Sequence, residues 1–443
     1  MIKVNPTTQV NEPHSKSLLS RSVTVVGYGL LIGMPFHATL VIWLGSVFGG
    51  QAVLSLWKEL IIAWIVLAAI VMSFKQGFRW LLRPVNIALM CAIGFGFIGL
   101  WLTARADTSV LVGIKTTVFP WLLCLAIQPF ASQFKWMNIR SIILITALAV
   151  SSLAILQFLV IPTLFLQSIG YNSTTIIPFQ GIQPGVDFGR SFATLGGPNQ
   201  LGAFLILPAV WSLTIAISNK NRKRRYQASI IFTFIVLAMV TTFSRSAWVG
   251  LAVAGLVVII RAVPKSWRVL VSGIATASLL IGWKIADYLI SSTTGLYRQL
   301  LLRGEITAAG VIGSDEGHII AFQSGIAKSL QHPLGLGYGA AGPASKYGSG
   351  FITENWYLQL VLELGWFGGI SWCIAVGFLI RSWWKDMSHE ATVLLATMSG
   401  LLVTNLFLHT FADSSLAITW WLIVGIYIGM QKVHHSKKLR EKI

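Results

Sequence analysis

The segment with the most evident chemistry runs from Glu354 to Gly368, in the order Glu-Asn-Trp-Tyr-Leu-Gln-Leu-Val-Leu-Glu-Leu-Gly-Trp-Phe-Gly. It closes the longest polar interval of a very apolar chain and opens an apolar run long enough to cross a membrane. A carboxylate, Glu354, and an amide, Asn355, therefore lie where the chain enters hydrocarbon, and Glu363 follows inside the run. Such groups are costly there and usually serve a site. The pattern predicts chemistry at a membrane surface.

Two arginines lie in other polar links of the chain. Arg190 belongs to Gly-Arg-Ser-Phe-Ala-Thr-Leu-Gly-Gly-Pro-Asn, residues 189–199, and Arg245 belongs to Phe-Ser-Arg-Ser, residues 243–246. A guanidinium binds phosphate oxygens through two parallel hydrogen bonds, and backbone N–H groups at a helix start favour anions. Asn199, Ser244 and Ser246 are the supporting polar groups. For Arg245 the alternative is an arginine that snorkels from a helix end, and both interpretations stay open.

The polar interval 287–354 holds further candidates. They are Arg298 and Arg303 as anion-binding groups, His318 as a proton acceptor or an ordinary exposed histidine, and Tyr338 in the run His-Pro-Leu-Gly-Leu-Gly-Tyr-Gly, residues 332–339. Asp315 and Glu316 fit a solvated loop face. The apolar spacing from Gly317 to Leu330 predicts one amphipathic helix, which Pro333 ends. The glycines after it predict a flexible turn.

These candidates belong to a polytopic membrane protein. Of the 443 residues, 55% are apolar and 11% are charged, which is unlike a soluble domain. We predict an all-α bundle of about twelve spans, with Cys91, Cys124 and Cys373 inside spans, and no disulfide framework or metal site. The predicted spans are 22–45, 59–74, 85–103, 110–131, 141–161, 199–217, 227–243, 247–262, 269–286, 355–380, 391–411 and 414–431.

The net charge of +19 is a topology signal, and it gives no ground for expecting a nucleic-acid partner. Most of the Lys and Arg residues fall in alternate links, which places both termini in the cytoplasm. The predicted segments are a cytoplasmic tail (1–21), N-terminal spans (22–161), an outer loop (162–198), central spans (199–286), a large, partly helical outer lid (287–354), C-terminal spans (355–431) and a basic cytoplasmic tail (432–443). An interfacial belt is expected from Trp57, Trp80, Trp136, Trp267, Trp383 and Trp384. Gly250, Ala254 and Gly255 are expected between packed spans.

Four features together resemble the O-antigen ligase and polymerase superfamily, the membrane glycosyltransferases that use polyprenyl-diphosphate-linked glycans. They are Arg190 with Gly-Pro-Asn199, the Phe-Ser-Arg245-Ser turn, the Gly-rich run ending at Gly339, and the Glu354-Asn355 to Gly368 segment. The resemblance is densest from about residue 186 to 412. The ligase branch has His-Asn, nine residues and then Gly-x-x-Gly; this chain has Glu354 in the histidine position. The match is closer to the polymerase-type members.

The resemblance implies sugar transfer from a lipid diphosphate at the outer face of the bacterial plasma membrane, without a cofactor or metal. Glu354 would be the general base, with His318 as its rival, and Arg245, Arg190, Arg298 and Arg303 would bind the diphosphate. Displacement would invert the anomeric carbon. The partners would be a lipid-linked donor, a glycan acceptor and membrane lipids, with a chain-length regulator or a flippase as candidate protein partners. A glycan ligase or oligosaccharyltransferase is the alternative, and a lipid-linked glycan transporter is a distant one.

Overall fold

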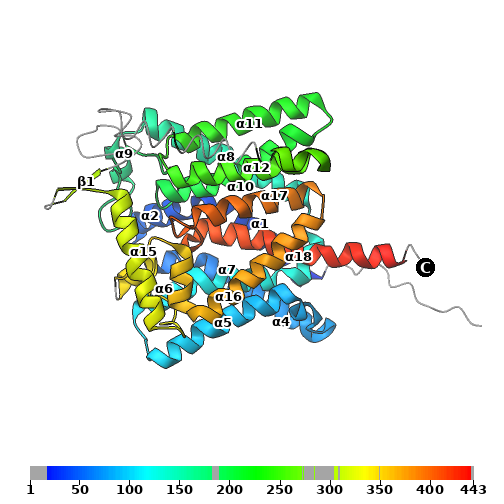
Figure 1. Ribbon diagram of the computed structural model, residues 1–443, viewed down its shortest axis with the longest axis horizontal. Helices are drawn as coiled ribbons and strands as arrows, with labels where there is room; N and C mark the ends of the chain where they lie inside the picture. The colour runs from blue at the N-terminus through cyan, green and yellow to red at the C-terminus, as the bar shows by residue number, and fades with distance from the viewer. Residues whose placement is uncertain are drawn as a thin grey trace, which may run out of the picture.

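The computed structural model describes residues 17–181, 189–271, 304–307, 310–348 and 350–440, together with residues 273 and 284; it does not describe the side chains of 76, 304–319 and 432–440. Long helices run side by side through the molecule (Figure 1). The first half contains α1 Leu18–Gly33, η1 Met34–Phe36, α2 His37–Phe48, α3 Gln51–Leu54, α4 Trp57–Gln76, η2 Arg79–Leu82, α5 Pro84–Thr103, α6 Thr108–Gly113, η3 Ile114–Val118, α7 Phe119–Ala126, η4 Gln128–Gln133, α8 Trp136–Leu159 and α9 Thr163–Ser168.

The second half continues the bundle and adds a small hairpin. Its elements are α10 Pro198–Ser218, α11 Arg222–Val240, α12 Arg245–Ala262, β1 Gly304–Thr307, β2 Gly310–Gly313, α15 Ser314–Gln331, η5 Pro343–Tyr347, α16 Trp356–Lys385, α17 His389–Thr404, η6 Thr410–Ala412 and α18 Ser414–Arg440. The two strands pair antiparallel, with Gly304 opposite Gly313 and Thr307 opposite Gly310. The fold is therefore the predicted all-helical bundle with one short hairpin among the described residues.

Nine helical stretches of the described chain are long and apolar enough to cross a membrane. Two other predicted spans correspond to helices that miss this standard. α11 begins with a basic turn, and α17 has only 16 residues. Most of predicted span 269–286 lies outside the described residues. The chain is thus a multi-pass membrane protein, and large apolar side chains such as Phe74 and Trp101 are exposed along its helices, as hydrocarbon contact requires.

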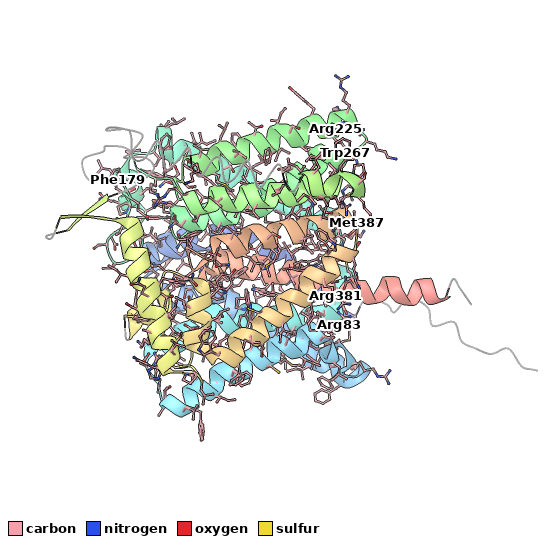
Figure 2. All side chains as sticks on the ribbon, in the orientation of Figure 1. Arg83, Phe179, Arg225, Trp267, Arg381 and Met387 are labelled. Carbon is pink, nitrogen blue, oxygen red and sulfur yellow. The ribbon has the colours of Figure 1, made fainter. Side chains whose placement is uncertain are left out.

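The two ends of the bundle differ in their side chains. Arg83, Arg225 and Arg381 lie at one end, which we call the basic end, and Phe179 lies at the other, which we call the loop end (Figure 2). α15 lies across the loop end, roughly perpendicular to the bundle (Figure 1). This helix confirms the prediction for Gly317 to Leu330, but its apolar Phe322, Ile326 and Leu330 are exposed. It packs instead through small residues; a Cβ built on Gly325 would lie 2.9 Å from Leu358.

α18 lies in the centre of the bundle, in an aromatic core. Its adjacent Trp420 and Trp421 are fully buried, and they pack edge to face against Trp383 and Trp121 respectively. The interfacial-belt prediction is therefore wrong for Trp383, which is buried, whereas Trp267 and Trp384 are exposed. Position near a span end could not reveal this, because α16 continues to Lys385 and turns one face of its last turn toward α18.

Candidate functional site

Arg190 connects the beginnings of two helices at the loop end. Its Nε donates to the carbonyl of Thr242 at 2.8 Å, and its Nη2 donates to Asn199 Oδ1 at 2.8 Å and to the carbonyl of Phe243 at 3.5 Å. Asn199 lies in the first turn of α10, and Thr242 and Phe243 form the turn before α12. The side chain is 9% exposed at most. The guanidinium thus holds the α10 start and the α12 start together, and the predicted Arg190–Asn199 cluster is a direct contact.

Arg245 is the first residue of α12 and is half-buried. The turn before it is tight. Phe243 has a left-handed backbone, with φ 49°, and the Ser244 amide donates to Thr242 Oγ1 at 3.1 Å. The hydroxyls of Ser244 and Ser246 lie 3.5 Å apart. Since helix N-termini carry partial positive charge, two of them beside two arginines favour an anion.

Glu354 is exposed and lies on an anchored, strained turn. Its φ of 51° is uncommon for a non-glycine residue. Thr353 Oγ1 donates to the Asn355 carbonyl at 2.9 Å. Asn355 caps α16, because its Oδ1 accepts from the Leu358 amide at 3.0 Å, and its Nδ2 donates to the Leu406 carbonyl at 2.9 Å. Asn355, which was predicted to support Glu354, therefore fixes the backbone turn on which Glu354 lies.

Residues 404–413, which we call the α17–α18 link, comprise the last residue of α17 and the segment before α18, and they connect these two groups. On one side, Thr404 Oγ1 donates to the Ser246 carbonyl at 3.4 Å, next to Arg245. On the other side, the Trp356 amide donates to the Asn405 carbonyl at 3.0 Å, two residues from Glu354. Asn405 is fully buried, and its Oδ1 accepts from the Thr410 amide at 3.0 Å. The end of α17 thus lies between the Arg245 turn and the Glu354 turn.

Two ionisable residues of the α17–α18 link, Asp413 and His409, are not among the site residues predicted from sequence. Asp413 caps α18 by accepting from the Leu416 amide at 3.0 Å, and a Cβ on Gly196 would lie 3.9 Å from its Oδ2. Burial raises the pKa of the Asp413 carboxyl. His409 lies in the same link, before η6. The only sequence signal that these two residues belong near the site is a cluster of polar residues just before the last span.

The Gly-rich run is closely packed, and the predicted turn is present at its start, where the Gly335 amide donates to the His332 carbonyl at 3.0 Å. α16 breaks at Gly365, with φ 72°, which leaves two carbonyls without helical partners. The amides of Leu336 and Gly337 donate to the carbonyls of Leu362 and Glu363, at 2.7 and 3.0 Å. Gly339 has φ 75°, and a Cβ there would lie 2.0 Å from the Ser109 carbonyl oxygen. These glycines allow close approach of backbones.

Tyr338 and Glu363 hold the same run from inside. Tyr338 is fully buried, and its hydroxyl donates to the Ile93 carbonyl at 2.8 Å. Glu363 is fully buried too, and its Oε1 accepts from the Gly339 amide and from Gln359 Nε2, both at 3.2 Å. Tyr338 therefore packs against α5. Glu363 lies beneath the Gly-rich run and binds its backbone at Gly339.

An ion cluster of the N-terminal half was missed by the sequence interpretation. Glu59 Oε1 lies 3.0 Å from Lys58 Nζ and 3.4 Å from Lys115 Nζ, and Lys58 is almost wholly buried. Lys115 Nζ also donates to Ser55 Oγ at 3.1 Å. The sequence did contain a signal for this cluster. Lys58 and Glu59 are adjacent opposite charges at the start of a span, and Lys115 lies inside another span. The cluster ties α4 to η3 and thereby joins two neighbouring spans.

The structure does not describe the side chains of three predicted site residues. Arg298 and Arg303 lie outside the described residues. The backbone of His318 lies in the first half of α15, and its side chain is not described. Among the described residues, no group of three or more His, Cys, Asp or Glu side chains is arranged to hold a metal ion.

The comparisons with known proteins bear on this loop-end geometry. Residues 228–373 match the model of a family described as O-antigen ligase. The matched region contains Arg245 and Glu354, and it does not reach Arg190 or the α17–α18 link. A comparison with curated proteins gives no match. Over residues 228–373 the chain is therefore similar to the O-antigen ligase family, which supports the resemblance to the O-antigen ligase and polymerase superfamily.

Proposed function

We propose that the protein is a membrane glycosyltransferase that polymerises polyprenyl-diphosphate-linked oligosaccharide repeat units, of the O-antigen, capsule or exopolysaccharide type. The observation that carries the proposal is the arrangement around the end of α17. The α17–α18 link contacts the turn of Arg245 through Ser246 and the turn of Glu354 through Asn355 and Trp356. This shared neighbour supports the assignment of the Arg245 turn and the exposed Glu354 carboxylate to one site.

In the proposed reaction, Glu354 accepts the proton of the acceptor hydroxyl as its oxygen attacks the anomeric carbon of the donor sugar. The bond from that carbon to the diphosphate oxygen breaks, and the polyprenyl diphosphate leaves with the electron pair. Attack from the opposite face inverts the anomeric configuration. General base catalysis typically contributes ~10²–10⁴-fold to the rate. Arg245 neutralises the departing diphosphate, and electrostatic stabilisation of this kind is usually the largest contribution.

The remaining residues have supporting parts in this proposal. Arg190 adds positive charge and fixes the Arg245 turn, while Asn355 fixes the Glu354 turn. Asn199, Ser244 and Ser246 orient phosphate oxygens. His318 stays the rival base, and Arg298 and Arg303 stay the candidate arginines of the lid. No step needs a metal or cofactor.

The proposed topology puts both termini in the cytoplasm of a bacterium and the loop end outside the plasma membrane. Its support is the basic end, where Arg83, Arg225 and Arg381 lie (Figure 2), because cytoplasmic links are enriched in Lys and Arg. A chain-length regulator or a flippase would meet the enzyme at this membrane.

The test supplies purified protein with a polyprenyl-diphosphate-linked repeat unit as both donor and acceptor, and resolves the products by length. A ladder of longer lipid-linked glycans is expected, and it is expected to disappear in Glu354→Gln and Arg245→Ala proteins that remain folded. A folded control is Lys346→Ala, at a loop-end position outside the site. Donor binding without turnover would contradict the proposal and favour a transporter.

A ligase is the second candidate, because the matched family is described as O-antigen ligase. A ligase or an oligosaccharyltransferase would move a finished glycan to a lipid, a wall polymer or a protein. The same assay distinguishes the two functions. Donor consumption that begins only after a chemically different acceptor is added would identify a ligase.

A further inference from the structure

An apolar cavity of about 670 Å³ lies between α10, α11 and α12. All the side chains that line it are apolar, from Val240 and Trp248 near the loop end to Phe232, Leu213 and Ile259 farther along. We call it the α11–α12 groove. These three helices form one edge of the bundle (Figure 1). Leu237, Val240 and Ile259 on these helices are 54%, 47% and 43% exposed, so the groove opens toward hydrocarbon.

The groove begins directly below the two arginines. Val240 ends α11, and the turn that follows supplies the Thr242 and Phe243 carbonyls bound by Arg190. Trp248 lies three residues after Arg245 on α12, which is about one helical turn. Its Nε1 donates to the Met239 carbonyl at 3.1 Å, and both residues line the end of the groove that is nearest to Arg245. From Trp248 to Ile259 the groove extends ~16 Å, about half of a hydrocarbon core of ~30 Å.

This combination fits one class of ligand, which has an anionic head and a long, flexible apolar tail. The head would meet Arg245 at the N-terminus of α12, where positive charge gathers. The tail would leave that point along the membrane normal and lie in the groove. We infer that the α11–α12 groove holds the polyprenyl chain of the lipid diphosphate donor. The inference rests on the proposed function and adds where the tail lies.

Gly255 keeps the groove open. The sequence predicts Gly250, Ala254 and Gly255 between packed spans, and this is confirmed for the first two. A Cβ on Gly400 of α17 would lie 2.5 Å from the Gly250 carbonyl oxygen and 3.1 Å from Ala254 Cβ. For Gly255 the expectation is wrong. A Cβ there would meet only Leu213, at 3.6 Å, and Gly255 lines the groove. A large side chain at this position can enter the groove without displacing backbone.

The experiment compares Gly255→Trp with Gly377→Trp. Gly377 is an exposed glycine of α16, where a Cβ would meet nothing within 4 Å, so it controls for a tryptophan on a lipid-facing helix. The probe is an unglycosylated polyprenyl diphosphate with a photoreactive group in its tail. We expect labelling of α11 and α12 peptides in the wild type and in Gly377→Trp, and at least a tenfold loss of labelling in Gly255→Trp. Excess polyprenyl diphosphate should compete, and excess phosphatidylglycerol should not.

Turnover provides the second readout. Donors with a long and with a short prenyl chain carry the same sugar, and the wild type should prefer the long one through a lower KM. Gly255→Trp should lose that preference, and Gly377→Trp should keep it. Three results would overturn the inference: labelling outside α10, α11 and α12, equal competition by phosphatidylglycerol, or a much larger fall in thermal stability for Gly255→Trp than for Gly377→Trp. The last would mean that protein fills the groove.

The two proposals fail in different ways. If the proposed function is wrong, the wild type transfers no sugar from either donor. If only the groove is wrong, the wild type transfers sugar and Gly255→Trp retains both the labelling and the preference for the long chain.

Discussion

At the scale of single residues, the two arginines of the site differ in depth. Arg190 is nearly buried and is bound to two backbone carbonyls, whereas Arg245 is half-buried at the start of α12. A guanidinium can donate in several directions at once, which a single ammonium cannot reproduce. The buried Arg190 holds the turn, and the more accessible Arg245 is the one that we propose to meet the diphosphate.

Lysine substitutions should separate these two parts. Arg190→Lys loses at least one of the contacts to Thr242, Phe243 and Asn199, and a buried acceptor left unpaired costs about 1–3 kcal/mol. We expect a lower thermal midpoint in detergent. Arg245→Lys keeps the charge and the fold, and it should lower kcat with little change in that midpoint. Equal thermal midpoints for the two variants would contradict this division.

Glu354 should show opposite effects on stability and activity. Its left-handed backbone favours glycine, so Glu354→Gly should preserve or raise the thermal midpoint while transfer is lost. Glu354→Gln retains the side-chain size and should lower turnover by ~10²–10⁴-fold. Thermal unfolding and product ladders measure the two quantities. Transfer at the wild-type rate in Glu354→Gln would exclude the carboxylate as the base and direct attention to His318.

Sequence could predict residues whose partners are near in the chain. The cluster of Arg190 with Asn199 is one such case, because nine residues separate them and both flank a helix start. The α17–α18 link could not be predicted in the same way. Its contacts reach Ser246 and Asn355, which are far away in sequence, and only the packing of α12 and α16 against α17 brings them together.

At the scale of elements, the Gly-rich run supplies hydrogen-bond donors to carbonyls that the break in α16 leaves unpaired. The break at Gly365 frees two carbonyls inside the bundle, where an unpaired carbonyl is costly. The run supplies two amides from outside α16. The sequence predicted a turn from its glycines, but turn glycines and packing glycines have the same composition. Only the neighbouring Leu100 and Ser109 backbone shows why side chains are excluded.

Two glycines of the outer segment offer a matched test. Gly339 and Gly350 both have positive φ, of 75° and 70°. A Cβ on Gly339 would overlap the Ser109 carbonyl, and a Cβ on Gly350 would meet nothing within 4 Å. Gly350→Ala should cost only the left-handed strain, about 1–2 kcal/mol. Gly339→Ala should cost clearly more, as measured by thermal unfolding. Similar losses would show that the run yields to a methyl group.

Helix predictions succeeded where apolar spacing was long and failed at breaks. The predicted helix of Gly317 to Leu330 agrees with α15, which runs from Ser314 to Gln331. The predicted span 391–411 ends too late, because α17 stops at Thr404 and the polar contacts of Asn405 replace helical ones. Hydropathy indicates whether a segment lies in an apolar environment, and the segment after Thr404 is still in one. It therefore cannot show where the helix ends.

At the scale of the whole molecule, the distribution of charge predicts orientation. Tyr347 is 63% exposed in η5 near the loop end, and Arg222 is exposed at the start of α11 at the basic end. In a background without Cys91, Cys124 and Cys373, Tyr347→Cys should react with a membrane-impermeant maleimide in intact cells. Arg222→Cys should react only after permeabilisation. The reverse pattern would invert the proposed topology and place the site in the cytoplasm.

The 16 residues of α17 extend ~24 Å, which is less than the ~30 Å hydrocarbon core of a typical bilayer. Most of α17 is buried among other helices, so its early end lies against protein and not against lipid. Non-helical backbone is tolerated at that depth because protein groups pair its amides and carbonyls, as Asn405 does for Thr410. A membrane-bound substrate that reaches the α17–α18 link must therefore move inward from the bilayer surface, and the length of α17 sets how far it descends before it can react.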